Sequence, residues 1–167
     1  FGEALHFVNG AYTGEKGHGP SMINPLSLNK LSRAVAALAR KYKWTDIVLG
    51  TSDFASLGTL KAMMQMFESL GLNVHTFENP EMTMPELSYT INARGYDCGI
   101  YLDSNPKTLS IKVLGDQGRL LKQEEQEQIN NLIQALEYDF DYKFQNPRKA
   151  SIIPSDYCYN LTNKGAS

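Results

Sequence analysis

The spacing of hydrophobic residues changes repeatedly along this chain, and the changes predict helices alternating with strands. A first amphipathic helix is expected from Pro25 to Tyr42, with Asn24 as its N-cap. A second helix, capped by Ser52 or Asp53, should end before Gly71, a residue suited to the left-handed backbone at a helix end. Two further helices are expected, one from Thr83 to Gly95 and one over 124–136.

Short apolar or alternating runs between these helices predict strands. They are Ala4–Val8, Asp46–Gly50, Leu72–Phe77, Cys98–Leu102 and Leu109–Leu114. This order favours an α/β fold, a three-layer α/β/α sandwich with a mostly parallel mixed sheet and a hairpin between the last two strands. The segment Gly10–Gly19 is rich in glycine and polar residues, which is typical of a mobile surface loop.

Length and composition narrow the function. The 167 residues suffice for one compact domain, taken as 1–145, followed by a tail or connection over 146–167. The net charge of −2 argues against nucleic acid or an anionic membrane as a partner. No apolar run is long enough to span a bilayer and no signal peptide is recognisable, so a cytoplasmic protein is expected. Cys98 lies in an apolar run and is expected to be a buried thiol.

Ligands of open α/β sheets bind beyond the carboxyl ends of the strands. In this chain that rule selects the segments 9–19, 50–53, 79–83 and 103–107. Thr51 and Ser52 could present hydroxyls and amides to a phosphate, although helix capping explains them equally well. The run Asp103-Ser104-Asn105-Pro106 is equally consistent with a tight hairpin turn, since all four residues favour turns.

The order of these segments resembles domain I of the phosphoglucomutase/phosphomannomutase family. Gly95–Leu102 is similar to the strand before the family's nucleophile loop, and 103–106 is similar to that loop, Thr-Ala-Ser-His-Asn-Pro. Phe1-Gly2 and 47–50 resemble two other family segments. The chain is two residues shorter between Gly99 and Pro106 than the family pattern. It also lacks the arginine of the family's opening loop and the Asp-x-Arg that follows its second strand.

The resemblance implies an isomerase of carbohydrate metabolism that moves a phosphoryl group within hexose phosphates through a phosphoserine. Ser104 or Asp103 stands at the phosphoserine position, depending on where the gap falls. Lys112 matches a lysine implicated in proton transfer and phosphate contact, and Asn105 matches the loop asparagine. His6 lies in the opening region as a candidate phosphate ligand, although a packed strand histidine is the simpler interpretation.

The family also implies partners and cofactors that this chain does not carry alone. Mg²⁺ would be held by a later domain, and a glucose 1,6-bisphosphate-type activator is expected. The chain would be inactive without further domains of its parent protein. The alternative is a catalytically degenerate homologue that serves as a sugar-phosphate-binding or interaction module.

Overall fold

The computed structural model describes residues 7–17 and 22–137. Within these ranges there are six strands: β1 (Phe7–Val8), β2 (Ala11–Glu15), β3 (Asp46–Thr51), β4 (Asn73–Glu81), β5 (Cys98–Ser104) and β6 (Thr108–Leu114). The α-helices are α1 (Pro25–Tyr42), α2 (Leu57–Ser69), α3 (Met84–Arg94) and α4 (Gln123–Glu137), and two short 3₁₀ helices are η1 (Phe54–Ser56) and η2 (Asp116–Gly118). The predicted tail, 146–167, lies outside the described residues, as do residues 4–6 of the first predicted strand.

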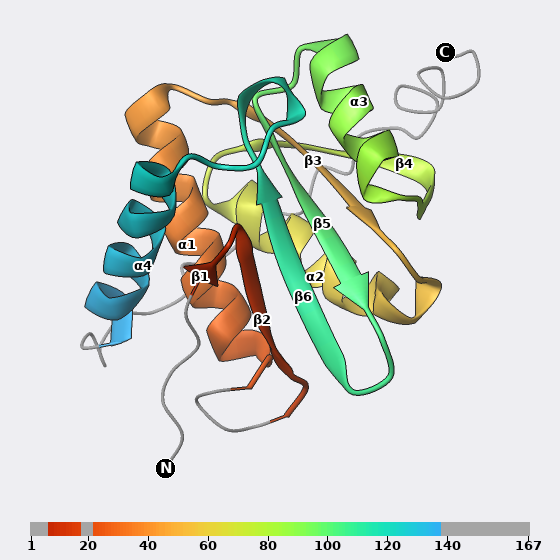
Figure 1. Ribbon diagram of the computed structural model, residues 1–167, viewed down its shortest axis with the longest axis horizontal. Coiled ribbons are helices and arrows are strands. Elements are labelled where there is room, and N and C mark those ends of the chain that lie inside the picture. Colours follow the sequence, from red (N-terminus) through yellow and green to blue (C-terminus); the bar gives the residue numbers. More distant parts are fainter. Residues whose placement is uncertain (1–6, 18–21, 138–167) are drawn as a thin grey trace.

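All six strands form one mixed sheet in the order β1-β2-β6-β5-β3-β4. β3 pairs in parallel with both β4 and β5, whereas β6 runs antiparallel to β5 and β2, and β1 antiparallel to β2. Four strands, β2, β3, β4 and β5, therefore point the same way. The predicted α/β class and the β5–β6 hairpin are confirmed (Figure 1).

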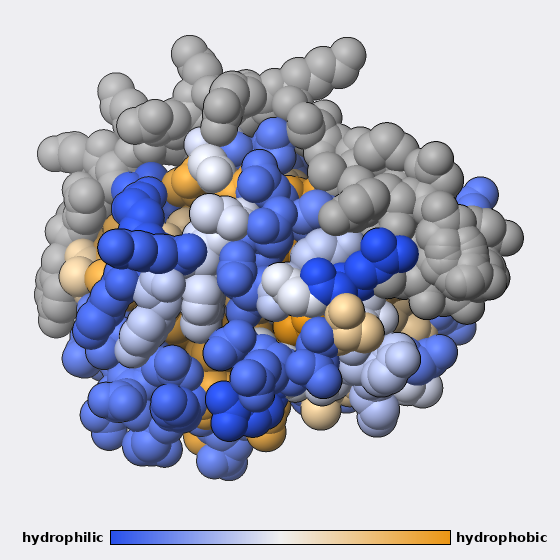
Figure 2. All heavy atoms as spheres, turned by 90° about the horizontal axis from the view of Figure 1, so that it is seen from above, coloured by the Kyte–Doolittle hydropathy of each residue, from blue (hydrophilic) through white to orange (hydrophobic). Residues whose placement is uncertain are grey.

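Helices cover both faces of the sheet. α1, α2 and α4 pack on one face, where residues such as Leu31, Phe67 and Ile133 are buried against strand residues including Ile100. α3 packs on the other face and buries Leu87 and Ile91 with Val48, Phe77, Tyr96, Tyr101 and Leu114. The face drawn in Figure 2 is mainly hydrophilic, and its hydrophobic areas lie between polar side chains. Among the described residues no helix is long and apolar enough to cross a membrane.

The predicted helix ends are largely confirmed. Asn24 accepts hydrogen bonds from the amides of Leu26 and Ser27, both at 3.1 Å, so it caps α1. Thr83 caps α3, and Gly95 ends it with a φ of +71°. Asp53 caps η1, and α2 begins only after this short helix, at Leu57.

The prediction of a mobile loop over Gly10–Gly19 is wrong for residues 11–15, which form β2. Asn9 and Gly10 have φ values of +54° and +80° and make a two-residue turn between β1 and β2. Asn-Gly is a strong signal for this kind of hairpin. Tyr12 is 1% exposed and anchors β2 in the core, while the backbone of β2 pairs along β6. One large apolar residue among small and polar ones left no recognisable alternation in the sequence.

Candidate functional site

The carboxyl ends of β3 and β5 lie side by side and bring two of the predicted site residues, Ser52 and Ser104, into contact. Because the strands pair in parallel, Thr51 lies opposite Leu102. Ser52 extends this pairing, its amide donating to the carbonyl of Leu102 at 2.8 Å. The Ser52 hydroxyl in turn accepts a hydrogen bond from the amide of Ser104 at 3.0 Å. Ser52 therefore holds the backbone of the candidate nucleophile.

Thr51 and Asn105 are engaged within the protein. The Thr51 hydroxyl is buried and lies 3.1 Å from the carbonyl oxygens of both Leu102 and Asp53. Asn105 Oδ1 accepts from the amides of Lys107 and Thr108, at 3.0 and 2.9 Å, and closes the hairpin. These contacts give both side chains a role in local structure.

The predicted turn over 103–106 begins later than expected. Asp103 and Ser104 are still part of β5, and the chain turns over Asn105–Lys107 before β6 begins. The two candidate nucleophiles are therefore consecutive strand residues, and consecutive strand residues point to opposite faces of a sheet. Ser104 pairs with Leu109, which is buried on the face covered by α1, α2 and α4.

Asp103 lies on the other face with Lys112. The Lys112 ammonium is 3.2 Å from the Asp103 carboxylate, and both side chains are partly exposed. Tyr101 follows the same alternation, and its hydroxyl donates to the Met82 carbonyl at 2.8 Å. Burial raises the pKa of Tyr101, and the nearby negative charge of Asp103 raises it further. The structure thus separates the Asp103–Lys112 pair from Ser104.

Lys16 is a site residue that sequence reasoning missed. It follows β2, and its ammonium lies 3.3 Å from Ser104 Oγ and 3.2 Å from the Asn105 carbonyl oxygen. Its backbone amide donates to the Lys107 carbonyl at 3.1 Å, which fixes this segment beside the hairpin. A basic residue in a Gly-rich segment was the available signal, but nothing in the sequence paired it with Ser104, 88 positions away.

The remaining predictions concern His6, a metal ion and Cys98. His6 lies outside the described residues, so its candidate role stays a prediction. No group of three or more His, Cys, Asp or Glu side chains within 7–17 and 22–137 could hold a metal ion. These residues therefore offer no Mg²⁺ site of their own, and the Mg²⁺ that the resemblance places in a later domain stays a prediction. Cys98 is a free, buried thiol, as predicted.

This arrangement defines a class of protein, an open α/β domain with a polar site beyond the carboxyl ends of its strands. The chain belongs to the phosphoglucomutase/phosphomannomutase family, since the model for that family's alpha/beta/alpha domain I matches residues 11–139. The match begins after Phe1-Gly2, the residues that resembled the family's opening motif.

Solved structures share this fold at low sequence identity. A protein described as a phosphomannomutase from Thermus thermophilus superposes with a TM-score of 0.75 and 18% identity, over 99% of this chain and 36% of its own. A phosphoglucomutase/phosphomannomutase family protein from Burkholderia thailandensis gives 0.66 and 11%, over 96% of this chain and 35% of its own. The open form of parafusin, a phosphoglucomutase from Paramecium, gives 0.57 and 13%, over 79% and 28%.

The chain therefore spans about a third of the length of the solved proteins it matches. A comparison with curated protein sequences gave no match.

Proposed function

We propose that this chain is the nucleophile-bearing domain of a phosphohexomutase, and that Ser104 is the residue that receives the phosphoryl group. The observation that carries the proposal is the 3.3 Å contact between Lys16 Nζ and Ser104 Oγ. The sequence left two candidates for the phosphoserine position, Ser104 and Asp103. Of these two, Ser104 has a lysine ammonium directed at its hydroxyl. Asp103 is instead neutralised by Lys112 on the opposite face.

Phosphoryl transfer depends mainly on positioning and on neutralising charge. A phosphoserine carries roughly −1.5 to −2 charges at neutral pH, and a lysine ammonium is a compact partner for its oxygens. Lys16 would supply that charge, while the Ser52 hydroxyl holds the Ser104 amide. Lys16 would then take over the phosphate contact that the family assigns to its missing arginine.

The remaining parts of the reaction belong to the rest of the parent protein. As the family resemblance implies, the Mg²⁺ would be held by another domain. The hexose phosphate would bind between this edge and those domains. We expect the chain alone to turn over no substrate.

Phosphate transfer to Ser104 can be measured directly. The complete gene product would be incubated with glucose 1,6-bisphosphate, and the phosphorylated residue would be located by mass spectrometry. We expect phosphate on Ser104 and loss of mutase activity in Ser104→Ala. The matched control is Ser110→Ala, a β6 hydroxyl that contacts Thr13 on the opposite face at 2.7 Å, and it should keep both phosphorylation and activity.

Lys16 can be tested in the same assay. Lys16→Met should lower kcat by about 100-fold, the scale on which one lost electrostatic contact to a transition state acts. Lys107→Met is the control, because Lys107 is exposed on the same hairpin and contributes its backbone amide and carbonyl to the hydrogen bonds there. Phosphate on Asp103, or full activity in Ser104→Ala, would refute the proposal. Binding of glucose 1-phosphate without any phosphorylation would support the degenerate binding module instead.

A further inference from the structure

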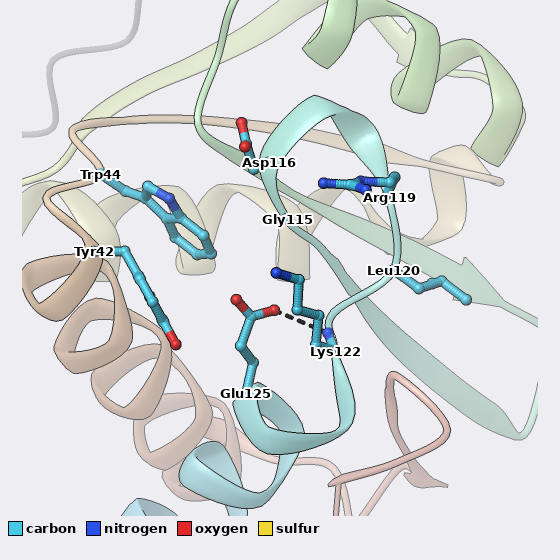
Figure 3. A pocket seen from close by; sticks show the side chains of 8 residues that line it. All are labelled: Tyr42, Trp44, Gly115, Asp116, Arg119, Leu120, Lys122 and Glu125. Atoms are coloured by element: carbon cyan, nitrogen blue, oxygen red, sulfur yellow. Dashed lines mark hydrogen bonds between the residues drawn. The ribbon is translucent and has the colours of Figure 1, made fainter.

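A pocket lies at the end of the sheet opposite to Ser104. It has a volume of about 350 Å³ and is lined by Tyr42, Trp44, Gly115, Asp116, Arg119, Leu120, Lys122 and Glu125 (Figure 3). Trp44 precedes β3 by two residues, and Gly115 follows β6, whose last residue pairs near the start of β5. The pocket therefore opens beside the amino ends of β3 and β5.

One wall of this pocket is aromatic and held in place by the end of α1. The rings of Tyr42 and Trp44 are stacked, with centroids 5.5 Å apart and an interplanar angle of 28°. Lys43 between them adopts the left-handed conformation, and the Trp44 amide donates to the Ala39 carbonyl at 2.8 Å. Trp44 is partly buried against the core, so its ring is positioned before any ligand arrives.

The facing wall is mostly polar and comes from η2, the segment that follows it and the first turn of α4. Asp116, Arg119 and Lys122 are exposed, and their side chains line the pocket together with Glu125 (Figure 3). The Glu125 carboxylate accepts a hydrogen bond from the Lys122 amide at 2.9 Å, which orients it at the pocket wall. This wall thus offers two cationic donors and two anionic acceptors around one space.

The mixture of charges selects the ligand. An anion attracted by Arg119 and Lys122 would be repelled by Asp116 and Glu125, and the reverse holds for a cation, so a net charge of either sign gains little here. A neutral molecule with many hydroxyl groups meets neither repulsion, since each hydroxyl can both donate and accept. The aromatic wall suits a flat face of C–H groups, and small-ligand sites combine such apolar walls with a few polar groups.

We propose that this pocket binds a neutral mono- or disaccharide, with one sugar ring against Trp44 and its hydroxyls toward η2 and α4. Its volume lies near the lower end of the roughly 300–1,000 Å³ usual for ligand sites, which fits one or two sugar rings. The site is separate from the proposed phosphoryl transfer at Ser104 and involves none of its residues.

Trp44 makes the test site-specific, because it is the one tryptophan of the chain. Glucose, maltose and cellobiose would each be titrated into the millimolar range while tryptophan fluorescence is recorded. AMP serves as an anionic ligand and choline as a small cationic one. We expect a saturable change with at least one neutral sugar and none with AMP or choline.

Single substitutions test whether the sugar binds in this pocket or elsewhere on the surface. Arg119→Ala removes an exposed donor and should weaken sugar binding about tenfold, and Tyr42→Ala should do the same through the aromatic wall. Tyr89→Ala is the matched control, because Tyr89 is 70% exposed on α3 and lies outside the pocket. Ser104→Ala should also bind normally, so failure of one proposal is distinguishable from failure of the other.

Three results would overturn this inference. They are no saturable response to any of the three sugars, saturable binding of AMP or choline in their place, and unchanged sugar binding in Arg119→Ala. Arg119 is exposed, so its removal leaves the core intact and keeps the test decisive even if Tyr42→Ala fails to fold.

Discussion

Replacing Gly118 with alanine should destabilise the domain strongly, because two backbones touch at this residue. Gly118 ends η2 with a φ of +75°, a conformation that alanine adopts at a cost of about 1 kcal/mol. An added Cβ would collide with the Ser88 carbonyl oxygen of α3 and lie 2.7 Å from Ser88 Oγ. Overpacking against a fixed backbone costs about 2 kcal/mol. The Ser88 hydroxyl also donates to the Gly118 carbonyl at 2.6 Å, and losing that bond costs about 1 kcal/mol.

These costs together predict a loss of about 4 kcal/mol, a large part of the roughly 5–15 kcal/mol that stabilises a typical domain. The corresponding drop in melting temperature is about 10 °C for a chain of this size. Urea unfolding followed by Trp44 fluorescence and by circular dichroism would measure the change. The matched control is Gly58→Ala on α2, where an added Cβ meets nothing within 4 Å. Alanine there should raise stability by up to about 1 kcal/mol.

A Gly118→Ala variant within about 1 kcal/mol of the original chain would refute this reasoning. It would mean that η2 can move away from α3 at little cost. Such movement would also displace Arg119, the next residue. Sugar binding by Gly118→Ala would therefore show whether the proposed pocket depends on the contact between η2 and α3.

The remaining predictions concern the core and its ionisable groups. Gly99→Ala should cost about 1–3 kcal/mol in urea unfolding, because its Cβ would lie 2.5 Å from Ile91 Cδ1 and 3.1 Å from the Val48 carbonyl oxygen. Burial raises the pKa of Asp46, but hydrogen bonds from His75 and Thr45 lower it more, so the net pKa is below the ordinary 3.8. Its contribution to stability is therefore present above pH 3.8 and lost as the pH falls below it, and Asp46→Asn should remove that part of the acid dependence. Burial also raises the pKa of Cys98, so in Cys158→Ser a thiol reagent should label Cys98 only as fast as the chain unfolds; rapid labelling of the folded chain would contradict its burial.

Sequence predicted the helices and the central strands well because their signals are local. The apolar spacing of α1 and its Asn24 cap lie within one continuous segment, and the same holds for α3 between Thr83 and Gly95. β2 was missed because Tyr12 is its one large apolar residue, so it shows no clear alternation, and because one of its two partners, β6, lies about a hundred residues later. The Asn9-Gly10 turn to its other partner, β1, was the local signal that could have revealed it.

The candidate site was likewise predicted only in part. The carboxyl ends of β3 and β5 were predicted to hold polar groups, and the structure brings Ser52 and Ser104 together there. The contact between Lys16 and Ser104 depends on the order of β2, β6 and β5 across the sheet. Neither residue carries a local signal for that order, so spacing alone could not pair them.

The short hairpin accounts for the choice between Asp103 and Ser104. Asn105 Oδ1 holds the turn by accepting two backbone amides, and this fixes the pairing of Ser104 with Leu109 and of Asp103 with Ser110. Leu109 is 1% exposed, so the face that carries it must remain in the core. A one-residue slip would place Leu109 opposite Asp103, so either Leu109 would turn out of the core or the two candidates would exchange faces. Burial of Leu109 thus directs Ser104 toward Lys16 and Asp103 toward Lys112, although the loop is two residues shorter than the family pattern.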